Sequence, residues 1–339
     1  MPAEAFRLGL FRAGLPHREL SRYISRKKMT KIQEALNPVS WAPLLKDKSI
    51  FYQYCMASGV PIPKLYAVFL KGTTGWSCNG AVLRSREDWE GFFDVEVPSE
   101  FVVKPAQGAY GRGVNAFART DGGFVDAFGR QYTTAGLYDM FFDAEDDRFV
   151  IQERLKNHPD LVRLSGTQSL QTTRYITLVD ASGECHIVHA YQKVIIGGHV
   201  IDTFMDGLMG NVEAPASLAD GVLGPASQVK GDGSGMRTMH AHPQTGVAIS
   251  GLRVPLWREA CKLVKETALK FLPIRTVGWD VSLTPDGPFI VEGNIWWDPP
   301  NQHPGMDTLI DALSRELQSS GAKQPRVVQL PSTATPRIP

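Results

Sequence analysis

The sequence has no excess of charge of either sign. Its 339 residues include 36 lysines and arginines against 35 aspartates and glutamates, so the formal net charge is +1. A chain without a strong global field has no general attraction for nucleic acid or for an anionic membrane surface. One local basic cluster near the N-terminus predicts a solvated helix face, with a surface for a polyanionic partner as the alternative. Its members are Arg22, Arg26, Lys27, Lys28 and Lys31.

Cysteine pairs and long apolar runs are also missing. The four cysteines stand far apart and include no CxxC pair, so they indicate neither a zinc site nor a dense disulfide framework and suit a reducing compartment. No apolar run approaches the ~20 residues that span a bilayer. Glu4 and Arg7 interrupt the N-terminus, which makes it a poor secretory signal. We therefore expect a cytoplasmic protein that inserts into no membrane.

What remains is an ordinary globular composition, 43% hydrophobic and 21% charged, with material for a buried core. Helical periodicity and short apolar strands alternate along the chain, which predicts an α/β (α+β) fold. Residues 46–59 and 255–272 favour helices, whereas residues 65–70, 101–105, 149–153 and 173–179 favour strands. Residues 197–250 predict a long loop or a β-rich excursion that carries substrate contacts.

The chain is expected to form five segments. They are a helical segment 1–45, a small α/β lobe 46–98, a lobe with a Gly-rich loop 99–160, a larger lobe with a metal site 161–319, and a disordered tail 320–339.

A predicted β-hairpin over residues 278–294 carries the most informative acids. Its two apolar halves flank a run of turn residues at 284–288, with Asp280 on one strand and Glu292 and Asn294 on the other. Glu292 and Asn294 are two residues apart, so on a strand they face the same side. Two carboxylates and an amide oxygen suit a hard divalent cation such as Mg²⁺. The alternative is a hairpin with solvated acids at its ends.

A Gly-rich loop over residues 107–113 directly follows a short strand that presents Lys104. Glycines let backbone N–H groups close over phosphate oxygens, and a lysine supplies a compact positive charge. The loop lacks the Gly-Lys-Ser/Thr ending of a P-loop, and no apolar helix opens after it as in a Rossmann fingerprint. The pattern predicts a hairpin loop that covers phosphates, or else a plain Gly-rich β-turn.

Two later strands present further candidates. The strand at 149–153 ends at Glu153, where its edge could hold an adenine and its acid the ribose hydroxyls; an ordinary strand end is the alternative. Arg174 begins the strand at 173–179 and could direct a guanidinium at a phosphate or carboxylate, or form a structural salt bridge.

Trp296 and Trp297 could wall an acceptor pocket or pack against the last helix. His240 and His242 could form a metal pair, although solvated or hydrogen-bonded histidines are expected at these and the other histidine positions.

The order of these features resembles the ATP-grasp superfamily over roughly residues 46–316. The series is Lys46 and Lys48, Lys104 with its Gly-rich loop, Glu153, Arg174, then Asp280, Glu292 and Asn294. Residues 151–159 and 172–177 make it most similar to the sugar-transfer-associated ATP-grasp group, relatives of α-L-glutamate ligases. Thr203 departs from the Asp-Asn-Phe-like segment expected at residues 201–204. The resemblance implies two α+β lobes that clasp ATP, preceded by a small N-terminal α/β lobe.

The resemblance also implies residue roles. Lys104 would contact the α- and β-phosphates, and Lys48 would be an auxiliary nucleotide contact. Gly108, Gly111, Arg112 and Gly113 would lie over the β- and γ-phosphates, with Gln152 and Glu153 near the adenosine. Asp280, Glu292 and Asn294 would hold Mg²⁺, with Mn²⁺ as the alternative. Arg174 and Lys193 would face the γ-phosphate and an acyl intermediate.

By the same resemblance, the expected activity is an ATP-dependent carboxylate–amine ligase that works through an acyl phosphate. The substrates would be a small carboxylate and a small amine, such as an amino acid or amino sugar, and a homodimer is compatible. No Ser/His/Asp or Cys/His nucleophile is apparent, and this chemistry needs none. The alternatives are a phosphotransferase acting on a hydroxyl and a non-catalytic ATP sensor.

Overall fold

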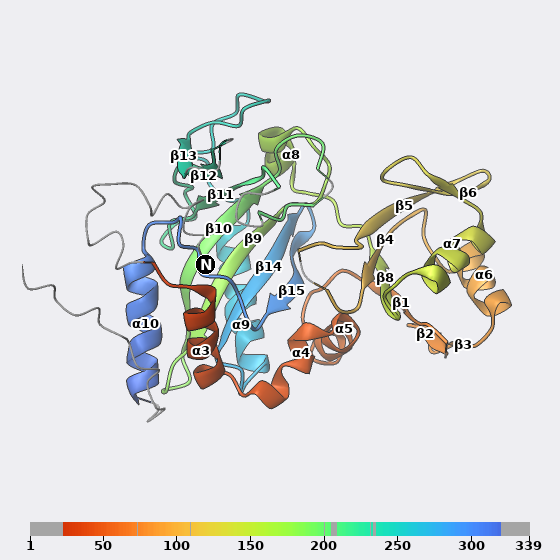
Figure 1. Ribbon diagram of the computed structural model, residues 1–339, viewed down its shortest axis with the longest axis horizontal. Coiled ribbons are helices and arrows are strands. Elements are labelled where there is room, and N and C mark those ends of the chain that lie inside the picture. Colours follow the sequence, from red (N-terminus) through yellow and green to blue (C-terminus); the bar gives the residue numbers. More distant parts are fainter. Residues whose placement is uncertain are drawn as a thin grey trace, which may run out of the picture.

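The computed structural model describes residues 23–319, apart from residues 73, 109, 200, 205–208, 231 and 233–234. Two antiparallel sheets lie side by side along the long axis of the molecule, one of eight strands and one of seven (Figure 1). The first part of the predicted helical segment, residues 1–22, and the predicted tail 320–339 lie outside the described residues. Within the described ranges, no helix combines the length and apolar composition needed to cross a bilayer.

The eight-stranded sheet joins residues 46–98 to residues 99–160, which the sequence analysis treated as separate lobes. Its order is β3-β2-β1-β8-β4-β5-β6-β7, and β1 pairs directly with β8. That pairing links distant parts of the chain, so periodicity alone did not reveal it. The strands are β1 (Leu65–Leu70), β2 (Gly75–Ser77), β3 (Val82–Leu83), β4 (Glu100–Pro105), β5 (Asn115–Thr120), β6 (Gly123–Asp126), β7 (Gln131–Tyr132) and β8 (Arg148–Glu153).

Helices α6 (Arg86–Val95) and α7 (Thr134–Asp143) pack against this sheet through aromatic residues. Ser85 and Thr133 cap their first turns with side-chain hydrogen bonds. The rings of Phe93 and Phe141 stack with centroids 5.8 Å apart, and Phe69 of β1 stacks on Phe141 at 5.3 Å. The small lobe therefore has a core of its own.

The seven-stranded sheet has the order β13-β12-β11-β10-β9-β14-β15. Its strands are β9 (Thr172–Val179), β10 (Cys185–Val194), β11 (Val212–Pro215), β12 (Ala226–Val229), β13 (Met236–Met239), β14 (Thr276–Thr284) and β15 (Gly287–Asn294). Residues 197–250, predicted as a loop or a β-rich excursion, combine loops with three four-residue strands, β11 to β13, which extend this sheet. Further helices are α3 (Arg26–Leu36), η1 (Val39–Trp41), α4 (Pro43–Lys46), α5 (Lys48–Ala57), α8 (Pro159–Ser165), α9 (Trp257–Lys270) and α10 (Met306–Ser319).

Alternation along β9 assigns the two faces of this sheet. Ile176 and Leu178 pack beneath α3 and α10, whereas Tyr175 faces α9 and its ring lies 5.2 Å from that of Trp257. Arg174 shares the face of Ile176, further along the strand. One face of the sheet is therefore covered by α9, and the other carries α3 and α10 over one part and Arg174 over the next.

The helices predicted over 46–59 and 255–272 are present as α5 and α9, and the 278–294 hairpin is present as β14 and β15. Helix α5 buries Phe51, Tyr52 and Cys55, whereas Ile50 is 42% exposed.

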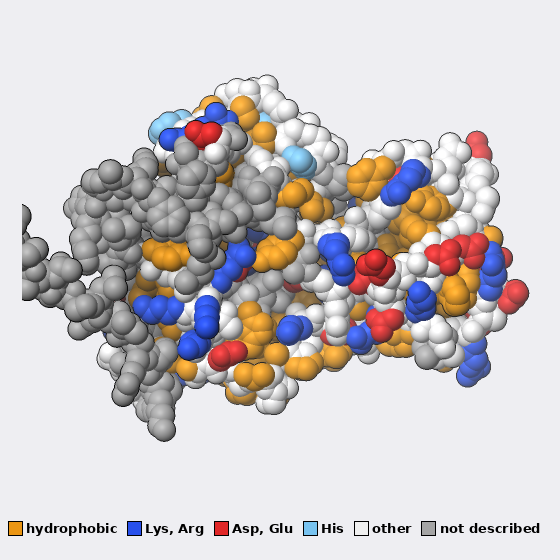
Figure 2. Space-filling model, in the orientation of Figure 1, with side chains coloured by type: hydrophobic (Ala, Val, Ile, Leu, Met, Phe, Trp, Pro, Cys, Tyr) orange, Lys and Arg blue, Asp and Glu red, His pale blue; other side chains and the backbone are white. Residues whose placement is uncertain are grey.

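The basic cluster lies on the outer face of α3. Lys27 and Lys31 are exposed, and Figure 2 shows Lys and Arg side chains gathered over this helix. Met29 and Ile32 on the opposite stripe are buried. The helix is amphipathic, as the solvated-face interpretation requires; Arg22 lies outside the described residues.

Candidate active site

A cleft of about 530 Å³ opens between the two sheets. Apart from Gly113, which follows in the same loop, every residue predicted to contact nucleotide, metal or acyl group lines this cleft. The lining members are Lys48, Lys104, Gly108, Gly111, Arg112, Gln152, Glu153, Arg174, Lys193, Asp280, Glu292 and Asn294.

Strand register places charged residues in a row across the seven-stranded sheet. Asp280 of β14 lies opposite Glu292 of β15 on one side and opposite Arg174 of β9 on the other. Lys193 of β10 is two residues from Tyr191, the register partner of Arg174, so it lies on the same face. Since paired residues on neighbouring strands have Cβ atoms about 5 Å apart, the backbone alone brings these charges together.

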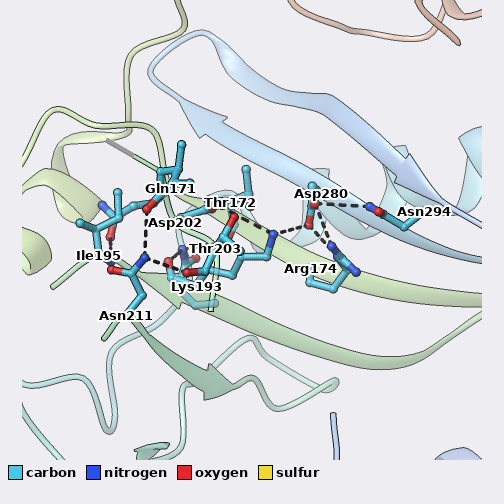
Figure 3. A network of polar contacts seen from close by, with 12 residues as sticks. Gln171, Thr172, Arg174, Lys193, Ile195, Asp202, Thr203, Asn211, Asp280 and Asn294 are labelled. Carbon is cyan, nitrogen blue, oxygen red and sulfur yellow. Dashed lines mark hydrogen bonds and ion pairs between the residues drawn. The ribbon is translucent and has the colours of Figure 1, made fainter. Parts of the chain in front are cut away.

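Asp280 is the centre of this row (Figure 3). Arg174 donates to it through two nitrogens, Nε to Oδ1 at 2.6 Å and Nη2 to Oδ2 at 2.9 Å. Lys193 Nζ lies 2.9 Å from Oδ1. Gly278 makes this fork possible, because a Cβ there would lie 3.1 Å from Arg174 Nη1 and 2.9 Å from the Trp297 side chain.

These contacts set the charge states of the row. Burial would raise the pKa of Asp280, but Arg174 and Lys193 outweigh it and hold that pKa well below its ordinary value. Burial lowers the pKa of Arg174 and of Lys193, yet the carboxylates beside them leave both pKa values raised. All three groups are therefore charged near neutral pH.

On the side of the small lobe, Lys104 and Lys48 approach Glu292. Lys48 Nζ lies 3.3 Å from Glu292 Oε1 and donates to Gly108 O at 3.4 Å. Lys104 is only 9% exposed. Burial lowers the pKa of Lys104 to about 8; Glu292 opposes this shift and Lys48 adds to it. A lysine that is this poorly hydrated is suited to an anionic ligand.

Asp47 holds Lys48 in place at the start of α5. Its carboxylate accepts from the backbone N–H of Ser49 at 3.0 Å and caps the helix. Arg148 of β8 lies 2.9 Å from the other oxygen, and Gln107 of the Gly-rich loop donates to it at 3.1 Å. This buried acid thus ties α5, the small sheet and the loop together, and no pattern in the sequence indicated it.

The Gly-rich loop connects β4 and β5 as an antiparallel hairpin, as predicted. Gly111 has φ +71° and packs against the other side of the cleft, since a Cβ there would lie 2.7 Å from Ile201 Cδ1. Gly113 has φ +72°, and its Cβ would lie 2.6 Å from Pro105 Cγ. Both positions therefore need glycine.

Side chains of the same loop reach outward. Tyr110 OH donates to Asp298 Oδ2 at 3.2 Å and so connects the loop to the segment after β15. Arg112, which is largely exposed, pairs with Asp146 at 3.3 Å. In this structure Arg112 borders the cleft while its guanidinium contacts the small lobe.

At the end of β8, Gln152 and Glu153 border the cleft. Gln152 is 2% exposed, and its Oε1 has no hydrogen-bond partner among the described residues. Glu153 Oε2 accepts from the backbone N–H of Lys64 at 3.0 Å. A buried acceptor without a donor is costly, so Gln152 fits a ligand that presents an N–H or O–H.

Asp280, Glu292 and Asn294, the residues predicted to hold a cation, converge on one patch. Asn294 Nδ2 donates to Asp280 Oδ2 at 3.4 Å. Asp280 shares its oxygens with Arg174 and Lys193. Mg²⁺ and Mn²⁺ prefer oxygen ligands, and these three side chains offer two carboxylates and an amide oxygen. The three residues therefore fit such an ion, and the neighbouring cationic side chains moderate the negative charge of the site.

A second network, missed as a site by the sequence analysis, lies beside Lys193 (Figure 3). Asp202 Oδ2 accepts from Thr172 N at 2.7 Å and from Thr172 Oγ1 at 2.6 Å, and Asp202 Oδ1 lies 3.9 Å from Lys193 Nζ. Asn211 Nδ2 donates to the carbonyls of Ile201 and Thr203, both at 2.9 Å. Asp202, in the segment where the family motif was expected, therefore belongs to the cleft, and Thr203 contributes through its backbone.

Glu213 was also missed. It is 5% exposed, lines the cleft and lies opposite Lys193 in the β10–β11 register. Gln302 Nε2 donates to its Oε2. Burial raises the pKa of Glu213 to about 7, although Lys193 and Arg174 act to lower it. The residue lies in the segment that the sequence marked for substrate contacts, but no motif singled it out.

Trp296 and Trp297 line the cleft, and Trp297 is also buried in the cluster beneath α3 and α10. The packing predicted for this pair is therefore confirmed for Trp297, and the acceptor-pocket role stays a prediction. His242 is buried and bonds to Ile195 O, while His240 bonds to Ser250 Oγ. These two are hydrogen-bonded histidines, and in the described part of the chain they belong to no cluster of metal-ligating residues.

A family model described as sugar-transfer associated ATP-grasp matches residues 27–307. No curated protein matches the chain. Similar solved structures include biotin carboxylase from Campylobacter jejuni (11% identity, TM-score 0.48, covering 82% of this chain and 48% of that one). D-alanyl-alanine synthetase A from Vibrio cholerae (11%, 0.45, 82% and 67%) and D-alanine–D-alanine ligase from Bacillus anthracis (12%, 0.43, 84% and 72%) are also similar. The chain spans about half the length of the biotin carboxylase chain.

Proposed function

Because the chain belongs to the sugar-transfer associated ATP-grasp family, we propose that it is an ATP-dependent ligase joining a small carboxylate to a small amine. The observation that carries this proposal is the buried row of Arg174, Lys193 and Asp280 facing Lys104 across the cleft. Such a site neutralises a transferring phosphoryl group and an acyl phosphate without needing a protein nucleophile.

The nucleotide would lie between the sheets. Lys104 and Lys48 would bind the phosphates beneath the Gly-rich loop, whose glycines allow the backbone a close approach. Gln152 Oε1, a buried acceptor, would take a hydrogen bond from the adenine amino group. Glu153 would bind the ribose hydroxyls with its carboxylate.

Asp280, Glu292 and Asn294 would hold Mg²⁺, with Mn²⁺ as the alternative. Such an ion neutralises phosphate charge and orients the phosphates when it is bound.

The reaction would proceed in two steps. A carboxylate oxygen of the first substrate bonds to the γ-phosphorus, and the bond between that phosphorus and the β–γ bridging oxygen breaks, which releases ADP. The amine nitrogen then bonds to the acyl carbon, and the bond from that carbon to the phosphate oxygen breaks. Lys193 and Arg174 would stabilise the anionic oxygens in both steps, and their own positions are held by Asp280.

The test measures ADP, free phosphate and amide while amino acids and amino sugars are offered as carboxylate and amine. We expect ADP and phosphate release that requires both substrates. Lys104→Met should lower it about 100-fold or more, because a buried cation at the phosphates is lost. Lys262→Met is the matched control, since Lys262 is exposed on α9, across the sheet from the cleft.

Two other outcomes would replace this proposal. A phosphorylated product without free phosphate would indicate a phosphotransferase, and ATP binding without turnover would indicate a sensor. The cytoplasmic location and a homodimer stay predictions from the sequence.

A further inference from the structure

Glu213 is the buried acid of the cleft that has no part in the two steps above. It lies opposite Lys193, and the two side chains point to the same face of the sheet. With neighbouring strands about 4.8 Å apart, Glu213 lies one strand beyond Lys193 and three strands from Asp280. It therefore borders the side of the cleft that is farthest from the metal-binding hairpin.

The sign of the charge changes along this face. Lys193 and Arg174 are cationic, and an anionic carboxylate substrate belongs beside them. Next to them come Glu213 and Asp202, whose carboxylates make the adjoining part of the cleft negative. A position of this charge, one strand from the acyl-binding lysine, is complementary to a cationic second substrate.

No cationic side chain of the described residues is in contact with Glu213. Its Oε2 accepts from Gln302, and His303 Nε2 lies 3.9 Å away. Burial and the neighbouring His189 lower the pKa of His303 well below its ordinary value, so His303 is neutral at physiological pH. Among the residues that the structure describes, no Lys or Arg nitrogen lies within 4.0 Å of this carboxylate. A buried carboxylate in that situation costs free energy, and a ligand cation would offset the cost.

We propose that Glu213 binds the ammonium group of the acceptor and takes the proton whose removal frees the nitrogen lone pair. This proposal rests on the ligase function proposed above. The acceptor it predicts is a primary amine that arrives protonated, rather than a hydroxyl or a neutral amide.

The ammonium nitrogen gives one proton to the carboxylate of Glu213, and its lone pair then forms the bond to the acyl carbon. The bond from that carbon to the phosphate oxygen breaks, and its electron pair leaves with phosphate. The second N–H proton goes to the departing phosphate, and Glu213 later returns its proton to water.

The surroundings of Glu213 suit a group that exchanges a proton near neutral pH. Burial raises its pKa to about 7, while Lys193, Arg174 and the hydrogen bond from Gln302 keep it from rising further. An arriving ammonium favours the ionised form. The charged or titratable groups that face Glu213 are Lys193 and Tyr191 of β10, Arg174 of β9, Asp202, and His303 of the segment after β15.

The experiment separates the acceptor step from acyl-phosphate formation. Hydroxylamine, a small nucleophile that is largely unprotonated at neutral pH, converts an acyl phosphate to a hydroxamate without an ammonium site. The enzyme is given ATP, Mg²⁺ and the carboxylates of the common amino acids, with either hydroxylamine or an amine from glycine, D-alanine and glucosamine. Glu213→Gln should lower the ratio of amide to hydroxamate about 100-fold, and Glu213→Asp should restore part of it.

A pH profile gives the second readout. The kcat/KM for the amine should rise through about pH 7 in the wild type, and this acid limb should be absent in Glu213→Gln. Glu259→Gln is the matched control, because Glu259 is exposed on α9 at the opposite face.

The ratio of amide to hydroxamate distinguishes the role of Glu213 from the ligase activity. An amide-to-hydroxamate ratio unchanged in Glu213→Gln would overturn the role of Glu213 while leaving the ligase intact, whether the two products stay high or fall together. A wild type that forms no hydroxamate from any carboxylate would overturn the ligase itself, and the acceptor site with it.

Discussion

Asp280 and Glu213 are two buried acids on the same face of one sheet, and their pKa values are shifted in opposite directions. Asp280 is in contact with the guanidinium of Arg174 and the ammonium of Lys193, which keep its pKa well below the ordinary value. Glu213 lies three strands away with an amide and a neutral imidazole in contact, and burial raises its pKa to about 7. Equal burial thus gives one permanent anion and one group that titrates near neutrality.

The difference comes from register rather than from composition. Asp280 has cationic residues on the strands to one side, because β9 and β10 present Arg174 and Lys193 toward it. Glu213 has Lys193 across from it, but the Nζ of that lysine is 2.9 Å from Asp280. A single lysine shared between two acids satisfies the first and leaves the second for a ligand.

The largest expected effects on turnover and stability come from substituting Asp280 and its register partner Glu292. Asp280→Asn should lower ATP turnover about 1,000-fold or more and should also lower the free energy of unfolding by about 3 kcal/mol, because two buried cations lose their partner. Glu292→Gln should lower turnover by a similar factor with little change in unfolding free energy, because Glu292 is 32% exposed and its ion pair with Lys48 is partly screened. Turnover assays and urea unfolding at neutral pH measure both.

Asp286→Asn, in the exposed turn of the same hairpin, is the control and should change neither quantity. Near-normal turnover in Glu292→Gln would contradict the metal assignment. Wild-type stability in Asp280→Asn would contradict the structural part of the argument.

A smaller effect should appear in the pH dependence of stability. The pKa of Glu213 is raised from 4.5 to about 7 on folding, so its proton favours the folded state and the unfolding free energy falls as pH rises through that window. Glu213→Gln should therefore gain stability relative to the wild type between pH 5 and pH 8, by at most about 3 kcal/mol.

The contribution of Asp280 to the free energy of unfolding is lost only as pH falls below the ordinary Asp pKa of 3.8. The stability difference between wild type and Asp280→Asn should thus stay flat over the same range.

Urea unfolding of the three proteins at pH 5, 6, 7 and 8 makes this measurement. Parallel stability curves for all three would show that Glu213 does not titrate in this range, and the contrast between the two acids would be lost.

The hairpin that carries Asp280 could be predicted from the sequence because its signals are local. Turn residues between two apolar runs predict the hairpin, and alternation puts Glu292 and Asn294 on one face. The Gly-rich loop after Lys104 is equally local, and its hairpin is confirmed. For these residues the sequence needed only short-range geometry.

The Glu213 side could not be predicted, because its signals are long-range. Glu213 belongs to the site through the pairing of β11 with β10, and its partner Gln302 is 89 residues away. Asp47 and Asp202 are similar cases, since hydrogen bonds to distant residues give them their roles. The joining of residues 46–98 to the small lobe likewise depends on the long-range pairing of β1 with β8.

The smallest expected effect adjusts Glu213 without removing it. Gln302 donates to the ionised carboxylate and so lowers its pKa. In Gln302→Leu, the acid limb of the pH profile of amide formation should move to higher pH by about half a pH unit to one pH unit. The reason is that the lost hydrogen bond costs the charged form of Glu213 about 1 kcal/mol. Gln131→Leu, at an exposed position of β7, is the matched control and should leave the limb in place. The corresponding donor to Asp280 is Asn294, and its loss should move no limb between pH 5 and pH 8, because Arg174 and Lys193 keep Asp280 ionised. A limb that stays fixed in Gln302→Leu, or moves to lower pH, would mean that a group other than Glu213 titrates there.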